Sequence, residues 1–203
     1  MQNRGKIIIF DLDGVLVNSL ENMRYTWTKV KKKFELTIPF KEYEKNIGLP
    51  FLKILKNLKI KKHNLDIKEY YKKISSENQN RIKIYNGVNK TLKDLKKNNK
   101  LAIFTSKDKD RTKKILKKFN IKFDLVVTPD DLKFGKPNPE GINLILKKLK
   151  YNKKNCIYIG DSLQDFIAAK RAKVIFLFAT WGYGKLIFKS YKIKKINEIF
   201  KYL

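Results

Sequence analysis

The most informative stretch of the sequence places two carboxylates one residue apart, directly after a run of apolar residues. Residues 7–10 read IIIF, and Asp11, Leu12, Asp13 and Gly14 follow them. Acidic residues are scarce in this chain, with 19 against 48 basic ones. Two neighbouring carboxylates can divide catalytic work, because one can act as a nucleophile while the other transfers protons. Carboxylate oxygens are also the ligands that a hard cation such as Mg²⁺ prefers.

Further reactive side chains follow later apolar runs. Thr105 and Ser106 follow the second such run, Lys136 stands in FGKPNPEG after the third, and Asp161 and Asp165 stand in GDSLQD after the fourth. A hydroxyl and an ammonium group can hold phosphoryl oxygens. A cation bound between carboxylates removes the repulsion that would otherwise raise the pKa of one of them. If the fold brings these groups together, the set predicts phosphoryl transfer.

Five short apolar runs have the pattern of buried parallel strands, and they must position these groups. Helical patterns separate the later runs, and strands that alternate with helices predict an α/β fold with a doubly wound, Rossmann-like parallel sheet. In such folds the ligand site lies at the carboxyl ends of the strands. The predicted strands cover residues 6–10, 101–104, 125–128, 156–159 and 174–178.

Residues 18–84 depart from this alternation, because their patterns are helical and amphipathic and contain no convincing strand. We therefore expect a small α-helical cap domain at residues 18–84, inserted into a catalytic core made of residues 1–17 and 85–203. The C-terminal segment KIKKINEIFKYL, residues 192–203, has the pattern of an amphipathic closing helix.

Four segments carry a resemblance to a known family. DLDGVLVNS, FTS, GKPNPEG and GDSLQDFIAAKRA, in this order, resemble the four motifs of the haloacid dehalogenase-like superfamily. IYNGV and WGYG resemble its phosphoglycolate-phosphatase-like branch, which has a helical cap. A lone DxDG motif is weak, but four motifs in order over residues 10–172 are specific. The resemblance implies a Mg²⁺-dependent phosphatase that hydrolyses a small phosphorylated metabolite, phosphoglycolate-like or a sugar phosphate, through an aspartyl-phosphate.

The resemblance also implies a role for each residue of the reaction. Asp11 would be the nucleophile that attacks phosphorus. Asp13 would protonate the leaving oxygen and then deprotonate the water that hydrolyses the aspartyl-phosphate. Thr105 and Lys136 would bind the phosphoryl group, with Ser106 beside them.

The same resemblance implies a metal site. Asp11, Asp161 and the main-chain carbonyl of Asp13 would hold Mg²⁺. Asp165 would lie in the outer coordination sphere or serve as an alternate ligand. Local alternatives exist for some of these residues, since Asp165 lies one helical turn after Asp161 and fits an ordinary helix acid, and the segment around Thr105 fits a helix N-terminus.

Two alternative functions follow from other features. A phosphomutase or phosphotransferase could use the same scaffold, but the family's sugar-phosphate mutases carry a cap histidine where this chain has Met23. The net charge of +29 suggests a basic nucleic-acid-binding or interaction protein with a vestigial site. Only five of the 48 basic residues are Arg, the residue that reads bases best. Lys, Asn, Ile, Phe and Tyr all have A/T-rich codons, so we favour compositional bias and expect no nucleic-acid partner.

The remaining composition sets the expected location. Cys156 is the single cysteine, which excludes a disulfide framework. The first residues lack the pattern of a signal peptide, and the apolar run at residues 174–179 is too short to cross a bilayer. We expect a cytoplasmic enzyme, a monomer or a homodimer, with a small phosphorylated metabolite as its partner.

Overall fold

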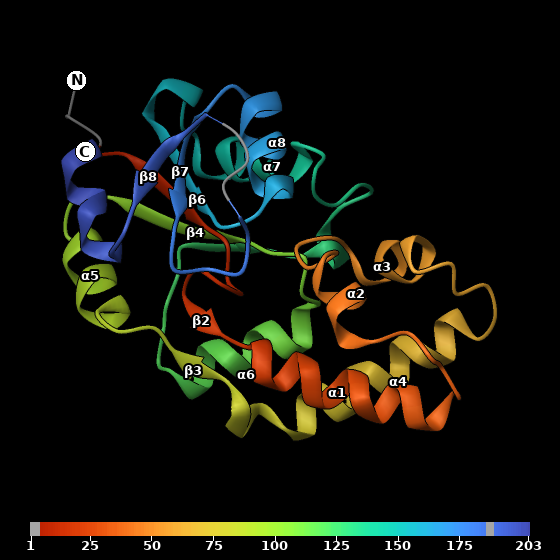
Figure 1. The fold of residues 1–203 in the computed structure, drawn as a ribbon. Coiled ribbons are helices and arrows are strands. Elements are labelled where there is room, and N and C mark those ends of the chain that lie inside the picture. The colour runs from red at the N-terminus through yellow and green to blue at the C-terminus, as the bar shows by residue number, and fades with distance from the viewer. Residues whose placement is uncertain (1–4, 186–188) are drawn as a thin grey trace.

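A six-stranded parallel sheet with helices on both faces forms one part of the molecule, and a group of helices beside it forms the other (Figure 1). The computed structural model describes residues 5–185 and 189–203. The strand order is β5-β4-β1-β6-β7-β8, which confirms the predicted α/β class. The strands are β1 (Ile7–Phe10), β4 (Lys100–Phe104), β5 (Leu125–Val127), β6 (Cys156–Gly160), β7 (Ile175–Ala179) and β8 (Tyr191–Ile193). The five predicted strands differ from these by no more than one residue at either end.

Both faces of the sheet are covered, which explains why β1 is apolar throughout. Ile8 and Phe10 pack on one face and Ile7 and Ile9 on the other, because successive side chains of a strand point in opposite directions. Each face therefore contributes its own apolar cluster. The helices are α5 (Val88–Leu95) and α6 (Lys109–Lys118) on the first face, and α7 (Glu140–Leu149) and α8 (Leu163–Ala172) on the second.

The register of the central strands brings distant residues together. Phe10 of β1 lies opposite Ile103 of β4 and Ile159 of β6. The residues that follow these strands therefore leave the sheet at one edge and at similar height. The site residues predicted after β1, β4 and β6 are placed together by this pairing.

Residues 18–84 are mainly helical and have an apolar cluster of their own. Trp27, Tyr43, Leu55 and Ile67 are buried in this cluster, and the Trp27 indole donates a hydrogen bond to the carbonyl of Ile38. The division into core and cap at the predicted boundaries stays a prediction. The helices are α1 (Leu20–Lys33), α2 (Phe40–Glu44), α3 (Phe51–Asn57), α4 (Asn64–Glu77) and the short 3₁₀ helix η1 (Gln79–Arg81).

Two short strands connect this helical segment to the sheet, and the sequence patterns did not predict them. β2 (Val17–Asn18) and β3 (Lys83–Ile84) pair in antiparallel fashion. Two residues per strand are too few for an alternating pattern to be recognised. The pairing holds the segment that leaves the sheet domain, at Val17–Asn18, next to the segment that leads back to it, at Lys83–Ile84.

The C-terminal segment was predicted as a helix, and that prediction is wrong for its first residues. Ile193 belongs to β8, which pairs in parallel with β7, and a 3₁₀ helix follows at η4 (Ile196–Tyr202). Ile193 is buried in the same cluster as Ile196 and Ile199. A strand of three residues gives no period of its own, so the helical spacing dominated the pattern. Two more 3₁₀ helices are η2 (Pro129–Asp131) and η3 (Lys153–Asn155).

None of the helices in residues 5–185 and 189–203 is long and apolar enough to cross a membrane.

Candidate active site

Asp11 lies at the carboxyl end of β1, where the backbone and one cation fix its carboxylate. Its amide donates to the carbonyl of Ile159, 2.8 Å away, and its Oδ1 accepts a hydrogen bond from the Leu12 amide at 2.7 Å. The Lys136 Nζ lies 2.8 Å from the same oxygen. Burial raises the pKa of Asp11 to about 7, against the lowering effect of Lys136. A further positive charge nearby would therefore stabilise the ionised form of the Asp11 carboxyl.

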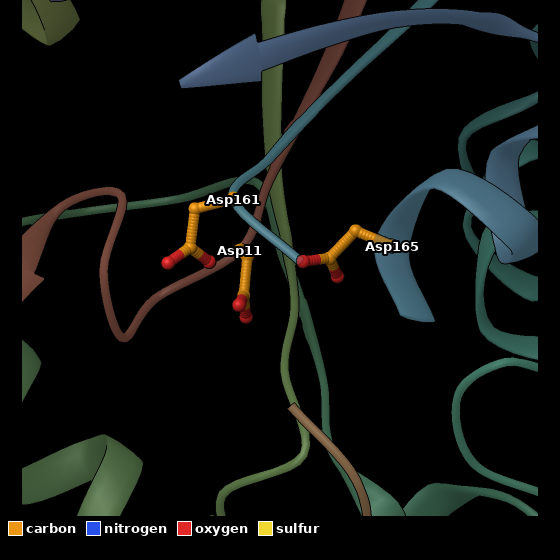
Figure 2. Close-up of side chains that lie close together, drawn as sticks. All are labelled: Asp11, Asp161 and Asp165. Atoms are coloured by element: carbon orange, nitrogen blue, oxygen red, sulfur yellow. The ribbon is translucent and has the colours of Figure 1, made fainter. Parts of the chain in front are cut away.

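Asp11 is part of a cluster of three buried carboxylates. Asp11, Asp161 and Asp165 each offer an oxygen within 4.8 Å of the others, and Figure 2 shows their side chains around a common space. Burial, and then the charges of Asp165 and Asp11, raise the pKa of Asp161 well above its ordinary value. Oxygen donors with excess negative charge match a hard divalent cation. The residues present therefore fit Mg²⁺.

Asp165 is the member of the cluster whose oxygens are already occupied. Its Oδ1 lies 2.7 Å from the Lys136 Nζ and accepts a hydrogen bond of 2.5 Å from the Tyr158 hydroxyl. Its Oδ2 accepts hydrogen bonds from the Ser162 amide at 3.1 Å and hydroxyl at 2.5 Å, in a capping box at the start of α8. These contacts fit an outer-sphere position for Asp165 better than a direct ligand.

Lys136 is a buried cation held between two carboxylates. It is 1% exposed, and its ammonium lies beside Asp11 and Asp165 and over the ring of Phe104, 5.0 Å from the centroid. Burial works against its charge, but the two carboxylates prevail and raise the pKa of Lys136. The structure thus places a fixed positive charge beside the predicted nucleophile.

Asp13 is not a member of the three-carboxylate cluster, and its carboxylate has partners of its own. Its Oδ1 accepts a hydrogen bond of 2.5 Å from the Ser19 hydroxyl, and its Oδ2 lies 3.1 Å from the Lys107 Nζ. The Asp13 side chain is therefore separate from the predicted metal ligands. That its main-chain carbonyl would hold the ion stays a prediction.

Thr105 and Ser106 line the same cavity, but their hydroxyl groups have different partners. Thr105 is 2% exposed, and its Oγ1 accepts a hydrogen bond from the Lys107 amide at 3.1 Å. The Ser106 hydroxyl donates to the carbonyl of Gly48, 2.7 Å away in the cap segment. Neither residue caps α6, since Asp108 does so. Ser106 therefore contacts the cap, and its role in substrate binding stays a prediction.

Glycines allow two loops to approach Asp161 closely. A Cβ on Gly14, where φ is +83°, would lie 2.1 Å from the Asp161 Oδ2, and one on Gly182 would lie 2.2 Å from the Asp161 Cβ. The amide of Tyr183, the residue after Gly182, donates a hydrogen bond of 2.6 Å to the Asp161 Oδ2. The WGYG segment, noted in the sequence only for its family resemblance, thus packs directly against a predicted metal ligand.

Sequence reasoning missed several residues of this site. The Tyr183 hydroxyl accepts a hydrogen bond of 2.6 Å from the amide of Ser19, which itself holds Asp13. Lys107 and Arg111 are 6% and 8% exposed although both are charged. No signal in the sequence separates these two residues from the other 46 lysines and arginines. The burial of Lys107 and Arg111 depends on how the helices of residues 18–84 pack over α6.

A small cavity of about 50 Å³ lies between the sheet edge and the cap helices. Asp11, Asp13, Asp161 and Thr105 line it from the core. The cap contributes mostly apolar and aromatic side chains, namely Met23, Tyr43, Leu49, Phe51, Ile54 and Tyr71. Sites for drug-sized ligands are several hundred Å³ in volume, so the cavity in this arrangement admits only a small molecule.

Comparisons with known proteins agree with this geometry. Residues 8–179 match the family model described as haloacid dehalogenase-like hydrolase. Pyrophosphatase PpaX of Halalkalibacterium halodurans is 32% identical over 82% of this chain and 80% of that protein. Phosphoglycolate phosphatase of Aquifex aeolicus is 32% identical over 89% of this chain and 87% of that protein. A haloacid dehalogenase-like family hydrolase from Streptococcus pneumoniae shares the fold, with a TM-score of 0.86, 21% identity and 99% of both chains covered.

The chain belongs to the haloacid dehalogenase-like hydrolase family. The predicted family resemblance and the prediction of an enzyme of the phosphatase kind are therefore confirmed.

Proposed function

We propose that this protein is a Mg²⁺-dependent phosphatase that hydrolyses a small phosphorylated metabolite through an aspartyl-phosphate on Asp11. The observation that carries this proposal is the buried cluster in which Lys136 contacts Asp11 while Asp161 lies within 4.8 Å. Asp11 and Asp161 would hold the ion together with the Asp13 carbonyl. When bound, Mg²⁺ supplies positive charge that balances the carboxylates and the phosphoryl oxygens.

In this proposal the chain's own groups carry out two successive displacements. The Asp11 carboxylate attacks phosphorus, the bond to the leaving oxygen breaks, and Asp13 gives that oxygen its proton. Lys136 and Thr105 hold the phosphoryl oxygens meanwhile. Asp13 then takes a proton from a water molecule, whose oxygen attacks the aspartyl-phosphate and releases inorganic phosphate. Ser19 and Lys107 keep the Asp13 carboxyl in place for both proton transfers.

The cavity supports a small substrate. A volume of about 50 Å³ favours a compact substrate over a nucleotide. Phosphoglycolate and pyrophosphate, the compounds that the two relatives' names mention, are compact in this sense. Met23, buried among the lining residues, offers no group that moves a proton, which favours hydrolysis over the phosphomutase alternative.

The test is phosphate release from a panel of small phosphorylated metabolites, with and without Mg²⁺. We expect release that requires Mg²⁺ and that falls at least about a thousandfold in Asp11→Asn, because the nucleophile is lost. Asp110→Asn, an exposed acid on α6, is the matched control and should keep its rate. Near wild-type turnover by a folded Asp11→Asn protein would contradict the mechanism.

A further inference from the structure

Two buried cations line the cavity, and neither of them contacts the phosphoryl group in the proposed chemistry. Lys107 and Arg111 both line the cavity that contains Asp11, and both belong to the segment that follows β4 and enters α6. Burying a charge is costly unless something compensates for it. Lys107 has that compensation from Asp13, and Arg111 has it from Asp108. What Arg111 can offer a ligand is therefore the set of N–H donors that these contacts leave unused.

Arg111 is held in place from both parts of the molecule. Its Nε lies 2.5 Å from the Asp108 Oδ2 on the core side, and its Nη1 donates to the Ser75 hydroxyl of the cap at 3.2 Å. The guanidinium carbon lies 5.3 Å from the ring centroid of Tyr71. A guanidinium has five N–H donors, and these hydrogen bonds use two of them. The fixed guanidinium therefore has donors left for a ligand.

The rest of the cavity offers this end few other polar groups. Tyr43 donates its hydroxyl to that of Tyr71 at 3.0 Å, and both phenols are near the Arg111 charge. The other cap side chains in the lining are apolar. The lining therefore combines the acidic residues Asp11, Asp13 and Asp161 with the two cations Lys107 and Arg111.

We propose that Arg111, with Lys107 beside it, binds a second anionic group at the non-reacting end of the substrate. This inference rests on the proposed function and makes it narrower. The substrate would be a small phosphoryl compound whose other end is a carboxylate or a second phosphoryl group. A planar guanidinium suits either group, because it can donate two parallel hydrogen bonds to paired oxygens.

The experiment compares substrates that differ only in that second group. Phosphoglycolate and pyrophosphate carry it, and 2-hydroxyethyl phosphate replaces the carboxylate of phosphoglycolate with a neutral hydroxymethyl group. In Arg111→Met, kcat/KM for the preferred doubly anionic substrate should fall roughly ten- to hundredfold, mainly through KM, as expected for a lost charge-assisted contact. The value for 2-hydroxyethyl phosphate should change less than about threefold. The substrate with the larger loss identifies the second group as carboxylate or phosphoryl.

Two further variants separate binding from a structural role. Arg81→Met is the matched control, because Arg81 also pairs with a carboxylate, Glu21, and lies over a tyrosine ring, that of Tyr25. It should leave the preference unchanged. Arg111→Lys, which keeps the charge, should recover part of the preference. If Arg111→Met does not fold, Arg111→Gln replaces it with the same expectation.

An equal loss for all three substrates, or no loss for any, would overturn the inference. Failure of the proposed function looks different, because the wild type itself would then release no phosphate. In that case calorimetry on Asp11→Asn still tests the inference. Phosphoglycolate should bind more tightly than 2-hydroxyethyl phosphate, and adding Arg111→Met should remove the difference. Equal affinity of the Asp11→Asn protein for both compounds would contradict the inference about Arg111.

Discussion

Lys136 decides how much negative charge the site can hold without a metal ion. Its ammonium lies 2.8 Å from Asp11 and 2.7 Å from Asp165, so one cation serves two of three clustered carboxylates. No ion pair with Asp161 is seen among residues 5–185 and 189–203, and burial and its two acidic neighbours raise its pKa well above normal against the weaker effect of Lys136. One unit of charge is too little for three carboxylates. The cluster is therefore under electrostatic strain until a divalent ion or protons relieve it.

This strain predicts how stability depends on pH in the metal-free protein. The pKa of Asp11 is about 7 when folded and 3.8 as a free group, so the folded state binds a proton that the unfolded state has lost. The free energy of unfolding should fall as pH rises from about 4 to about 7, with Asp11 contributing up to about 4 kcal/mol. Urea unfolding in EDTA at several pH values measures this.

Asp11→Asn and saturating Mg²⁺ provide the controls for that measurement. The substitution should flatten the pH dependence, because it removes the titrating carboxyl. Mg²⁺ should raise stability more at pH 8 than at pH 5, because it binds the charged carboxylates. A wild-type protein whose stability rises steadily with pH over this range without metal would contradict the role assigned to the cluster.

At the scale of elements, the site depends on loops that follow strands and approach one another closely. The loop after β1 and the loop after β7 both press on Asp161, and only glycine fits at Gly14 and Gly182. The loop of the cap reaches the core in a similar way, since the Gly48 carbonyl accepts the Ser106 hydroxyl. The register of the strands sets the level at which each side chain leaves the sheet, and the loop contacts then set how that side chain is oriented.

Gly182→Ala should therefore damage the proposed metal site. The added methyl group would lie 2.2 Å from the Asp161 Cβ, so either the loop or the carboxylate must move. We expect Mg²⁺ affinity, measured by calorimetry, to fall at least about tenfold, comparable with the loss from disturbing a ligand's supporting contacts.

Gly87→Ala is the matched control for this prediction. A side chain at Gly87 would also strain the backbone, because φ there is +80°. Its Cβ, however, would meet only the Cγ2 of Ile196, at an ordinary contact distance of 3.7 Å. The change should lower stability by about 1 kcal/mol through backbone strain and leave Mg²⁺ affinity unchanged. Equal effects of the two substitutions on Mg²⁺ binding would show that the loop after β7 has no special relation to Asp161.

At the scale of the whole molecule, the net charge of +29 matters for the proposed anionic substrate. Lysines are distributed along the entire chain, and a field of this sign attracts small anions toward the cavity. The charge therefore has a physical consequence even where compositional bias is its origin.

The predicted consequence is a dependence of catalysis on salt. For the best substrate, kcat/KM should fall several-fold as the ionic strength rises from about 20 mM to about 300 mM, because screening shortens the reach of the field. The value of kcat at saturating substrate should change little. Steady-state rates in NaCl, at fixed free Mg²⁺, test this. A kcat/KM that does not depend on salt would show that the lysines contribute nothing to substrate capture.

From the sequence alone we could predict which segments form the strands. We could also predict that Asp11, Asp13, Asp161 and Lys136, which follow strands, are candidate site residues. Apolar runs and their period are local properties of a sequence, and the register of a parallel sheet then makes the ends of its strands neighbours. Five strands were located in this way to within one residue. β2 and β3 were missed because two residues carry no period, and β8 was missed because the helical spacing of the residues after it dominated the pattern.

Only the tertiary structure decided which oxygen faces which partner. Asp165 is occupied by Lys136, Tyr158 and Ser162, and no spacing in the sequence reveals this. Nor does any pattern distinguish Arg111 among 48 basic residues, since its burial depends on Ser75 and Tyr71, 36 and 40 positions earlier in the chain. Such contacts depend on how helices of the cap pack over the core, and that packing is a property of the whole fold.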